Sequence, residues 1–99
     1  MKTVMVRYKV KPDRVAENEG LVVKVYEQLK NENPQKLRYA TYKLDDGVSF
    51  VHIATIQTDG TNALTEISAF KEFVSGIKDR CDEPPVTTSV TCVGFYEPK

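Results

Sequence analysis

Apolar residues run almost without interruption through one short segment of the chain. Residues 50–56 read FVHIATI, so both faces of an extended strand would carry mainly apolar or small side chains. A strand with one face in water alternates apolar and polar residues, and this segment is therefore predicted to be buried on both faces. Asp46-Gly47 stands before it and follows a run rich in β-branched and aromatic residues at 37–44. Because Asp-Gly supplies the positive φ angles of tight hairpin turns, the pattern predicts a β-hairpin over residues 37–56.

The turn determines which residues of the hairpin face each other. A two-residue turn predicts four cross-strand pairs: Leu44 with Ser49, Tyr42 with Val51, Thr41 with His52, and Tyr39 with Ala54. Two sets of side chains then lie on opposite faces, Tyr39, Thr41, Phe50 and His52 on one and Ala40, Tyr42, Val51 and Ile53 on the other. A three-residue turn with a bulge would exchange the partners but would still separate Phe50 and His52 from Val51 and Ile53.

A strand and a helix are predicted ahead of the hairpin. Residues 3–10 are rich in β-branched and aromatic side chains, which favours a first strand. Pro12 suits the first turn of a helix, and apolar residues recur at helical spacing over about residues 12–31, ending before Asn33-Pro34. Gly20 inside this helix indicates a bend or a close contact between the helix and the sheet.

A second helix and a last strand are predicted after the hairpin. Thr61 or Asn62 is the expected cap of a helix over about residues 63–80. The apolar face of this helix consists of Ala63, Ile67, Phe70, Val74 and Ile77, with Leu64 and Phe73 beside it. Pro84-Pro85 ends the helix. Residues 86–96 are then predicted to form the strand that closes the sheet, with Val90, Cys92 and Phe95 in it.

The predicted order of elements defines the fold class. Strand, helix, strand, strand, helix, strand is the ferredoxin-like βαββαβ arrangement, an α+β fold that we expect to form a single domain over residues 1–99. Right-handed crossovers give a four-stranded antiparallel sheet of order 4-1-3-2 with both helices on one face. The two central strands are then those with continuous apolar runs, so the face away from the helices is also expected to be dry. A two-fold homodimer with the sheets face to face, a dimeric α/β barrel, would cover that face.

Charge and composition exclude several classes of partner. The 99 residues include 14 basic and 14 acidic ones, interspersed along the chain. This pattern offers no basic patch for nucleic acid or for an anionic membrane. No apolar run is long enough for a signal peptide or a membrane span, so we expect a cytoplasmic location. Cys81 and Cys92 match no zinc or redox spacing and are expected to be buried structural thiols.

Three stretches of the sequence have the lengths and hydrophobic patterns of one known family. They are VMVRYKVKPDRVAENEGLVVKVYEQL for the first strand and helix, LRYATYKLDDGVSFVHIATI for the hairpin, and SAFKEFVSGI in the second helix. On these stretches the chain resembles the dimeric α/β-barrel superfamily, in particular the small proteins grouped with antibiotic biosynthesis monooxygenases. The resemblance implies a homodimer with an apolar pocket in each subunit. Some members oxidise aromatic polyketides with O₂ and without metal or flavin, others degrade haem, and many have no known substrate.

Two departures from the family pattern bear on activity. Haem-degrading members of this fold use an Asn on the first strand with a Trp and a His, whereas here the first strand has no Asn and the chain has no Trp. Haem degradation is therefore disfavoured. The cofactor-free oxygenases also often use a Trp, so the missing Trp departs from their pattern as well.

Two other families share the βαββαβ topology. GVSFVHI at residues 47–53 is similar to the third strand of the RNA-recognition motif, but Asp46 stands where Lys or Arg belongs and the first stacking aromatic is missing. Acylphosphatase needs a glycine-rich anion-binding loop after the first strand, and KVKPD at residues 9–13 is not that loop. Neither interpretation is favoured.

His52 is the only histidine and the leading catalytic candidate. A side chain that titrates near neutral pH could deprotonate a phenolic or enolic substrate, so that the resulting carbanion reacts with O₂. The alternative is a core or interface histidine hydrogen-bonded to Thr41, Tyr39 or the backbone. Tyr8, Tyr39 and Phe50 are the candidates for a ligand-binding pocket. A lone histidine without suitably spaced carboxylates cannot form a metal site, so no metal is expected.

Two functions from different classes follow from this pattern. The first is a small homodimeric, monooxygenase-like oxidoreductase that acts without a tightly bound cofactor on an apolar or aromatic molecule. The second is a non-catalytic homodimeric module that binds a small apolar ligand or fills its own cavity. A cavity of about 300 Å³ or more with His52 in its wall would favour the first, and a space packed solid by Phe70, Phe73 and Tyr26 would favour the second. Arg7 and Arg38 could hold an anionic group or could simply be solvated.

Overall fold

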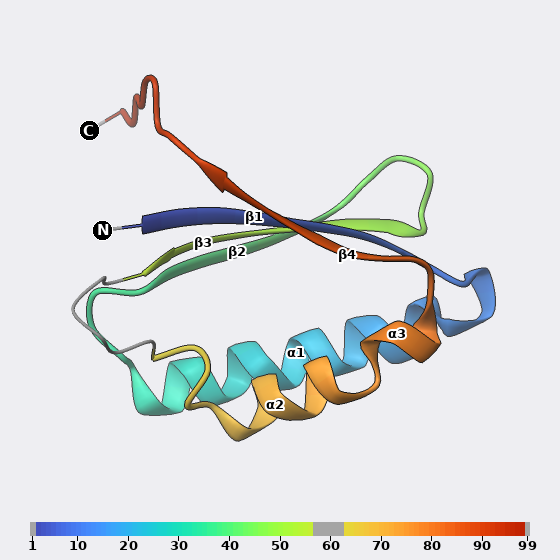
Figure 1. The fold of residues 1–99 in the computed structure, drawn as a ribbon. Coiled ribbons are helices and arrows are strands. Elements are labelled where there is room, and N and C mark those ends of the chain that lie inside the picture. Colours follow the sequence, from blue (N-terminus) through green and yellow to red (C-terminus); the bar gives the residue numbers. More distant parts are fainter. Residues whose placement is uncertain (1, 57–62, 99) are drawn as a thin grey trace.

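Four antiparallel strands form one sheet, and the helices pack on one face of it (Figure 1). The computed structural model describes residues 2–56 and 63–98, so the predicted loop and helix cap at 58–62 lie outside the described residues. In chain order the elements are β1 (Lys2–Val10), the 3₁₀ turn η1 (Pro12–Arg14), α1 (Val15–Glu32), β2 (Arg38–Lys43), β3 (Ser49–Ile56), α2 (Ser68–Ser75), α3 (Ile77–Arg80) and β4 (Cys81–Val90). The sheet order β2-β3-β1-β4 confirms the predicted ferredoxin-like topology. Within the described ranges, no helix has the length and apolar character needed to cross a bilayer.

The hairpin of β2 and β3 has the predicted register. Tyr39 pairs with Ala54, Thr41 with His52 and Tyr42 with Val51, and the backbone N–H of Leu44 donates to the carbonyl of Ser49 at 2.9 Å. Gly47 lies at φ 76°, a conformation that strains residues with a side chain. The carboxylate of Asp46 accepts the backbone N–H groups of Val48 and Ser49 at 3.0 and 2.8 Å. Gly47 therefore supplies the positive φ angle of the turn, and Asp46 supplies the acceptor for the backbone N–H groups that follow.

The first helix ends where the sequence predicts. Asn33 adopts the left-handed conformation at φ 46°, and its backbone N–H bonds to the carbonyl of Leu29. Val25 and Asn18 are the buried residues of α1. Gly20 is exposed, and nothing lies within 4 Å of the position that a Cβ would take there. The prediction of a close helix–sheet contact at Gly20 is therefore wrong.

The second helix begins later than predicted and is divided in two. Ile67 has an extended backbone, with φ −79° and ψ 123°, and α2 begins only at Ser68. Leu64 and Ile67 are nevertheless buried, because a turn can bring apolar residues three apart into the core as a helix does. Gly76 separates α2 from α3. A Cβ at that position would lie 3.2 Å from the Nη1 atom of Arg80, so glycine leaves room for the guanidinium.

The last strand begins earlier and ends earlier than predicted. β4 follows α3 directly and continues through Pro84-Pro85. Proline lacks the N–H of a ladder bond, but it is tolerated here because β4 lies at the edge of the sheet. Residues 91–98 leave the sheet (Figure 1), and Phe95 is 73% exposed, so the prediction that it helps to close the sheet is wrong. Cys92 is also exposed, whereas Cys81 is buried as expected, and both thiols are free.

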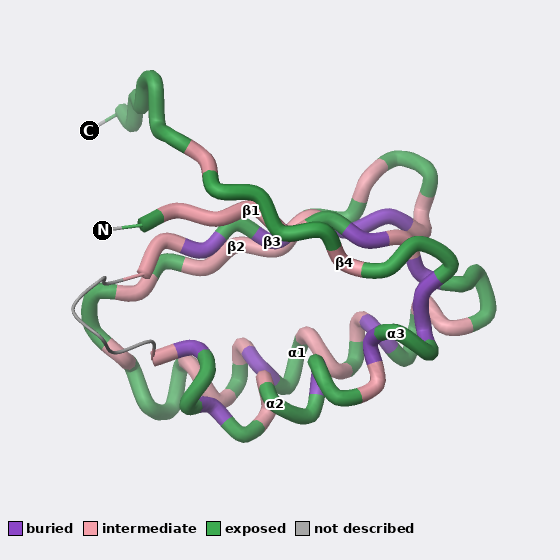
Figure 2. The backbone as a smooth tube through the Cα atoms, viewed as in Figure 1, coloured by how far each residue is buried: buried purple, intermediate pink, exposed green. Residues whose placement is uncertain are grey.

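Burial is concentrated between the sheet and the helices (Figure 2). Buried Tyr8, Phe50 and His52 point from the sheet toward the helices, and Val25 and Phe73 come from α1 and α2. On the opposite face of the sheet the apolar side chains are uncovered in the single chain. Those with the largest exposed fractions there are Tyr42 at 57% and Val86 at 63%. Ile53 is also exposed on that face.

Candidate functional site

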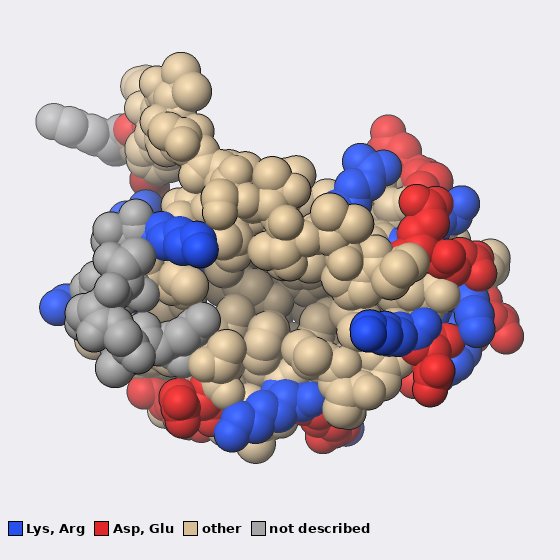
Figure 3. Space-filling view, in the orientation of Figure 1, with Lys and Arg blue, Asp and Glu red and all other residues tan. Residues whose placement is uncertain are grey.

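An apolar cavity lies between the helix-facing side of the sheet and α2. Its volume is about 280 Å³. The residues that line it are Val4, Val6, Tyr8, Tyr39, His52, Ala54, Ile56, Leu64, Thr65, Phe70, Phe73, Val74, Ile77, Pro85 and Thr87. Figure 3 shows the surface hollowed at the centre of this view, in a region without charged side chains, with Lys, Arg, Asp and Glu gathered around its lower and right-hand margins. The cavity therefore suits an uncharged ligand.

Five rings stand in a row along the wall formed by the sheet and α1. Tyr8 stacks on Phe50 at a centroid distance of 5.6 Å and on His52 at 5.3 Å. Tyr39 stacks on the other side of His52 at 5.5 Å and on Tyr26 at 5.4 Å. The row follows from the sheet register, because Tyr8 pairs with Phe50 across β1 and β3, and Thr41 pairs with His52 across β2 and β3. His52 is thus held between two tyrosine rings.

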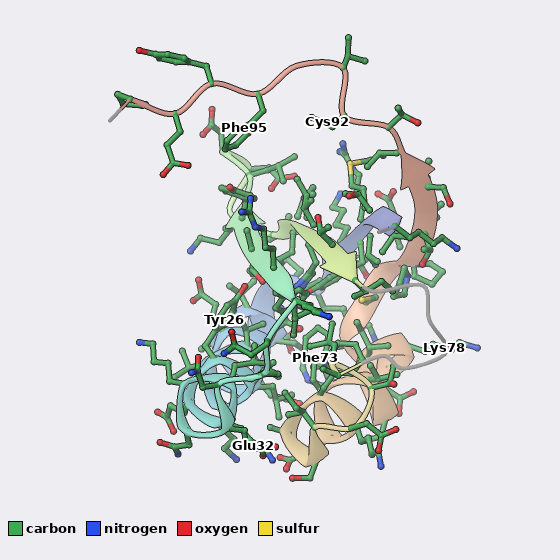
Figure 4. The ribbon with its side chains drawn as sticks, turned by 90° about the vertical axis from the view of Figure 1, so that its left-hand side faces the viewer. Tyr26, Glu32, Phe73, Lys78, Cys92 and Phe95 are labelled. Carbon is green, nitrogen blue, oxygen red and sulfur yellow. The ribbon has the colours of Figure 1, made fainter. Side chains whose placement is uncertain are left out.

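Phe73 and Phe70 of α2 cover this row from the helix side. Phe73 lies 5.4 Å from the His52 ring and 6.2 Å from the Tyr8 ring, between centroids. Phe70 meets Tyr39 edge to face at 6.4 Å. Figure 4 shows Tyr26 and Phe73 rising from α1 and α2 into the space below the sheet. The cavity remains open although Phe70 and Phe73 line it, and Tyr26, the third side chain expected to fill it, lies outside its lining.

Both ring nitrogens of His52 have hydroxyl partners. The hydroxyl of Tyr8 lies 2.7 Å from Nε2, and the hydroxyls of Tyr39 and Thr41 lie 2.7 and 2.9 Å from Nδ1. The amide of Asn18 donates to the Tyr8 oxygen at 3.1 Å. The Tyr8 hydroxyl therefore directs its own proton toward Nε2, which must be the unprotonated nitrogen. In a neutral ring the proton then sits on Nδ1 and is shared by the two hydroxyls there.

Arg80 fixes the direction of this chain of hydrogen bonds. Its Nε donates to the Oδ1 atom of Asn18 at 3.2 Å, and its Nη2 donates to the carbonyl of Phe73 at 2.8 Å. Arginine has donors only, so the oxygen of the Asn18 amide must face it and the nitrogen must face Tyr8. The guanidinium also lies 5.2 Å from the centre of the Phe73 ring. Among the described residues it has no carboxylate partner, although only 1% of it is exposed.

Burial keeps the site uncharged at neutral pH. It lowers the pKa of His52 from 6.5 to about 4, because an imidazolium loses its hydration there. Burial likewise raises the pKa of Tyr8 and of Tyr39 well above the ordinary value, and the hydrogen bond from Asn18 opposes this only in part for Tyr8. His52 is therefore a neutral imidazole that can accept a proton, and both tyrosines are phenols that can donate one.

The structure brings together three of the four candidate residues. His52, Tyr8 and Tyr39 line the cavity and contact one another. Phe50 is buried behind Tyr8 and is not among the residues that line the cavity. Arg7 lies on the opposite face of the sheet, since its neighbours Val6 and Tyr8 line the cavity, and it is exposed.

Sequence reasoning missed the two residues that orient the site. Asn18 is completely buried, and Arg80 nearly so. A signal for each was present in the hydrophobic pattern. Asn18 stands three residues after Val15 and four before Val22, within the apolar stripe of α1, and Arg80 continues the spacing of Phe73 and Ile77. A polar residue inside such a stripe indicates a buried partner.

The sheet, the helices on one side of it and the enclosed cavity define a ferredoxin-like α+β protein with a site of small-molecule size. No protein-family model matches the sequence, and no curated protein matches it. Solved structures do match. A crystal structure of an antibiotic biosynthesis monooxygenase is 19% identical, with a TM-score of 0.72, over 95% of this chain and 100% of that chain. Rv0793 from Mycobacterium tuberculosis is 15% identical, with a TM-score of 0.74, over 97% of this chain and 98% of that one.

A third match has a stated activity. A mutant of SnoaB, a cofactor-independent oxygenase from Streptomyces nogalater, is 15% identical, with a TM-score of 0.68, over 95% of this chain and 94% of that one. These identities are low, so the similarity is one of fold. The chain has the fold of the antibiotic biosynthesis monooxygenases, as the sequence resemblance implied.

Proposed function

We propose that the protein is a homodimeric, monooxygenase-like enzyme that acts on a small apolar or aromatic molecule without a tightly bound cofactor. The observation that carries the proposal is the hydrogen-bonded group of Tyr8, His52 and Tyr39 in the wall of an otherwise apolar cavity. Small-molecule pockets usually span about 300–1,000 Å³ and combine an apolar lining with a few polar groups. At about 280 Å³ the cavity suits a compact aromatic molecule.

The proposed chemistry begins with a proton transfer. A phenolic or enolic substrate in the cavity gives its proton to the oxygen of Tyr8, while the proton of Tyr8 moves along the 2.7 Å hydrogen bond to the Nε2 atom of His52. The substrate anion then adds to O₂ and forms a peroxide anion. That anion takes up one proton, and the hydroperoxide loses water to leave a carbonyl group. His52 is the base, Tyr8 is the group in contact with the substrate, and Tyr39 holds the imidazole from its other side.

Phe50 has a supporting part in this proposal. It stacks on the Tyr8 ring at a centroid distance of 5.6 Å and fixes the plane of the phenol. The stacking interplanar angle of 13° shows how closely the two rings align. Contact with the ligand itself is proposed for Tyr8 and Tyr39.

The homodimer is the second part of the proposal. Apolar side chains on the sheet face away from the helices are exposed in the single chain, notably Tyr42, Ile53 and Val86. Exposed Phe95 lines one hollow together with Ile53, so this apolar surface continues into the segment after β4. An uncovered apolar surface of this kind favours self-association, and a two-fold axis is the simplest way to close it. A cytoplasmic location and a single-domain organisation stay predictions of the sequence.

Oxygen uptake tests the catalytic part. Small dihydroxyaromatic compounds would be screened as substrates in an oxygen electrode with the purified protein, His52→Gln and Tyr8→Phe. Removing a group that transfers protons should lower the rate by about 10²–10⁴-fold. Tyr96→Phe changes a tyrosine that is 85% exposed in the segment after β4 and should leave the rate unchanged. Equal rates for wild type and His52→Gln would remove His52 from the mechanism.

A non-catalytic ligand-binding module is the second candidate. One observation favours it: both nitrogens of His52 already have partners, so the site is satisfied without a substrate. In that case compounds from the same screen should raise the melting temperature of the protein without consuming O₂. Consumption of O₂ that is lost in His52→Gln would instead support the enzyme over the binding module.

A further inference from the structure

A second hollow adjoins the cavity and shares one wall residue with it. Its volume is about 260 Å³, and it is lined by Tyr26, Leu29, Lys30, Asn33, Pro34, Leu37 and Tyr39. Tyr39 is the residue common to both spaces. Tyr26 lies on the side of the second hollow only and is partly exposed. The ring of Tyr39 thus separates the apolar cavity from a space bordered by polar and charged groups.

A continuous line of hydrogen bonds passes around this ring. The Nδ1 atom of His52 lies 2.9 Å from the hydroxyl of Thr41, and that hydroxyl lies 2.8 Å from the hydroxyl of Tyr26. Each of these hydroxyls can accept one proton and release another. Tyr39 also contacts Nδ1, but among the described contacts Thr41 is the one that continues to Tyr26.

The other end of the line is closed. Beyond Tyr8 the chain runs to Asn18 and ends at Arg80, which has no atom that can accept a proton. Arg80 and Asn18 are both fully enclosed. Within the hydrogen bonds of the described residues, a proton that reaches His52 from the cavity can therefore leave the chain toward Thr41 and Tyr26, or return to the cavity wall through Tyr39.

We propose that Thr41 and Tyr26 form a proton relay that connects His52 in the cavity with the open hollow beside α1. The transfer is balanced at every atom. One proton arrives at Nε2, the proton on Nδ1 moves to the oxygen of Thr41, the former Thr41 proton moves to the oxygen of Tyr26, and the Tyr26 proton passes to water. In the reverse direction, the same steps carry one proton from water to the cavity and restore the tautomer with its proton on Nδ1.

Burial of His52 favours such a relay. It lowers the pKa of the ring to about 4, so a ring with two protons is disfavoured near neutral pH and acceptance at Nε2 is coupled to release at Nδ1, whose proton points to Thr41. The catalytic use of the relay rests on the proposed function. Proton removal from the substrate uses the outward direction, and protonation of the peroxide anion uses the inward one. Tyr26 and Thr41 are then positioning and relay residues that need not touch the substrate.

Exchange of the His52 Nδ1 proton with water tests the relay without turnover. The protein would be labelled with ¹⁵N-histidine, and NMR saturation transfer at neutral pH would give the exchange rate. In wild type the Nδ1 proton should exchange much faster than the backbone amide of His52, which reports opening of β3. Thr41→Val removes the hydroxyl at constant shape and should slow the exchange at least about tenfold, because local opening must replace transfer along hydrogen bonds. Tyr26→Phe should slow it as well, and Thr41→Ser should keep the wild-type rate.

Controls separate the relay from a general change of the fold. Thr88→Val and Tyr96→Phe make the same two chemical changes at exposed positions, in β4 and in the segment after it, and should leave the rate unchanged. Wild-type exchange in both Thr41→Val and Tyr26→Phe would overturn the proposal, since the proton would then leave through the cavity. Exchange in wild type at the rate of the backbone amide would overturn it too. A protein that consumes no O₂ but shows relay-dependent exchange would refute the proposed function and leave the relay intact.

Discussion

Replacing Asn18 with leucine should destabilise the protein far more than its place on a helix suggests. Asn18 is completely buried, accepts the Nε hydrogen of Arg80 and donates to Tyr8. Leucine has the same branching and the same number of heavy atoms, although its methyl groups are larger and add some crowding, and the charged Nε donor loses its acceptor. A buried donor without a partner costs about 1–3 kcal/mol, and more when it is charged, so we expect a loss of about 2–4 kcal/mol.

The assay is urea unfolding at a fixed protein concentration, because self-association would make stability depend on concentration. For a chain of this size the loss corresponds to a decrease of roughly 10–25 °C in Tm. Asn31→Leu is the matched control, since Asn31 is exposed on the same helix and the change there should stay within about 0.5 kcal/mol.

A double variant sharpens this prediction. Arg80→Met alone removes the charge but leaves the Asn18 amide oxygen and the Phe73 carbonyl without donors. Asn18→Leu with Arg80→Met removes both members of the pair, so the double variant should be more stable than the sum of the two losses predicts, by about 1–2 kcal/mol. Losses that simply add, or an Asn18→Leu variant as stable as Asn31→Leu, would refute the role assigned to this pair.

Three further predictions concern charge, association and glycine. The pKa of His52 is about 4 in the folded chain and 6.5 when unfolded, so stability that is fully present above pH 6.5 should fall by on the order of 3 kcal/mol as the pH drops toward 4; His52→Phe should flatten this slope in urea titrations at a series of pH values. Val51→Asp on the uncovered sheet face should give a monomer by light scattering, and an unchanged mass in solution for wild type and variant would count against the dimer. Gly20→Ala, where the Cβ meets nothing, should stabilise the protein by about 0.5–1 kcal/mol in thermal melts, whereas Gly76→Ala, which crowds the Arg80 guanidinium, should destabilise it by about 1 kcal/mol or more. Equal effects of the two alanines would contradict the close contact at Gly76.

The hairpin could be predicted in detail because its information is local. Asp46-Gly47 determines the turn, and the period of two then places Phe50 and His52 on one face and Val51 on the other. Which of these faces meets the helices depends on packing outside the hairpin, so the pattern of the hairpin left that choice open.

The predicted bounds of the second helix and the last strand were wrong where one local sequence signal is compatible with two structures. Prolines end helices and interior strands but are compatible with an edge strand, so the start of β4 at Cys81 depends on its place in the sheet. Apolar residues at Leu64 and Ile67 have helical spacing but are buried from a turn. The end of β4 at Val90 has no distinct signal, because the residues after it are as apolar as those before it.

The sequence predicted the residues that line the cavity around His52 but not the two buried polar residues behind Tyr8. His52, Tyr8 and Tyr39 stand out in the sequence as titratable or aromatic residues on predicted strands, and they meet in the structure. Asn18 and Arg80 come from two helices and act on Tyr8 from 10 residues and 72 residues away in sequence, a relation that spacing along the chain does not reveal. Their place in apolar stripes was the available signal.

Pro84-Pro85 also limits what the sheet can become. β4 forms one free edge of the sheet, where a strand from another molecule could dock and begin a fibre. Two adjacent residues without backbone donors interrupt the outer row of hydrogen bonds at that edge. The two prolines therefore act against amyloid-like pairing of copies along this part of the edge, although in the sequence they were interpreted as the end of a helix.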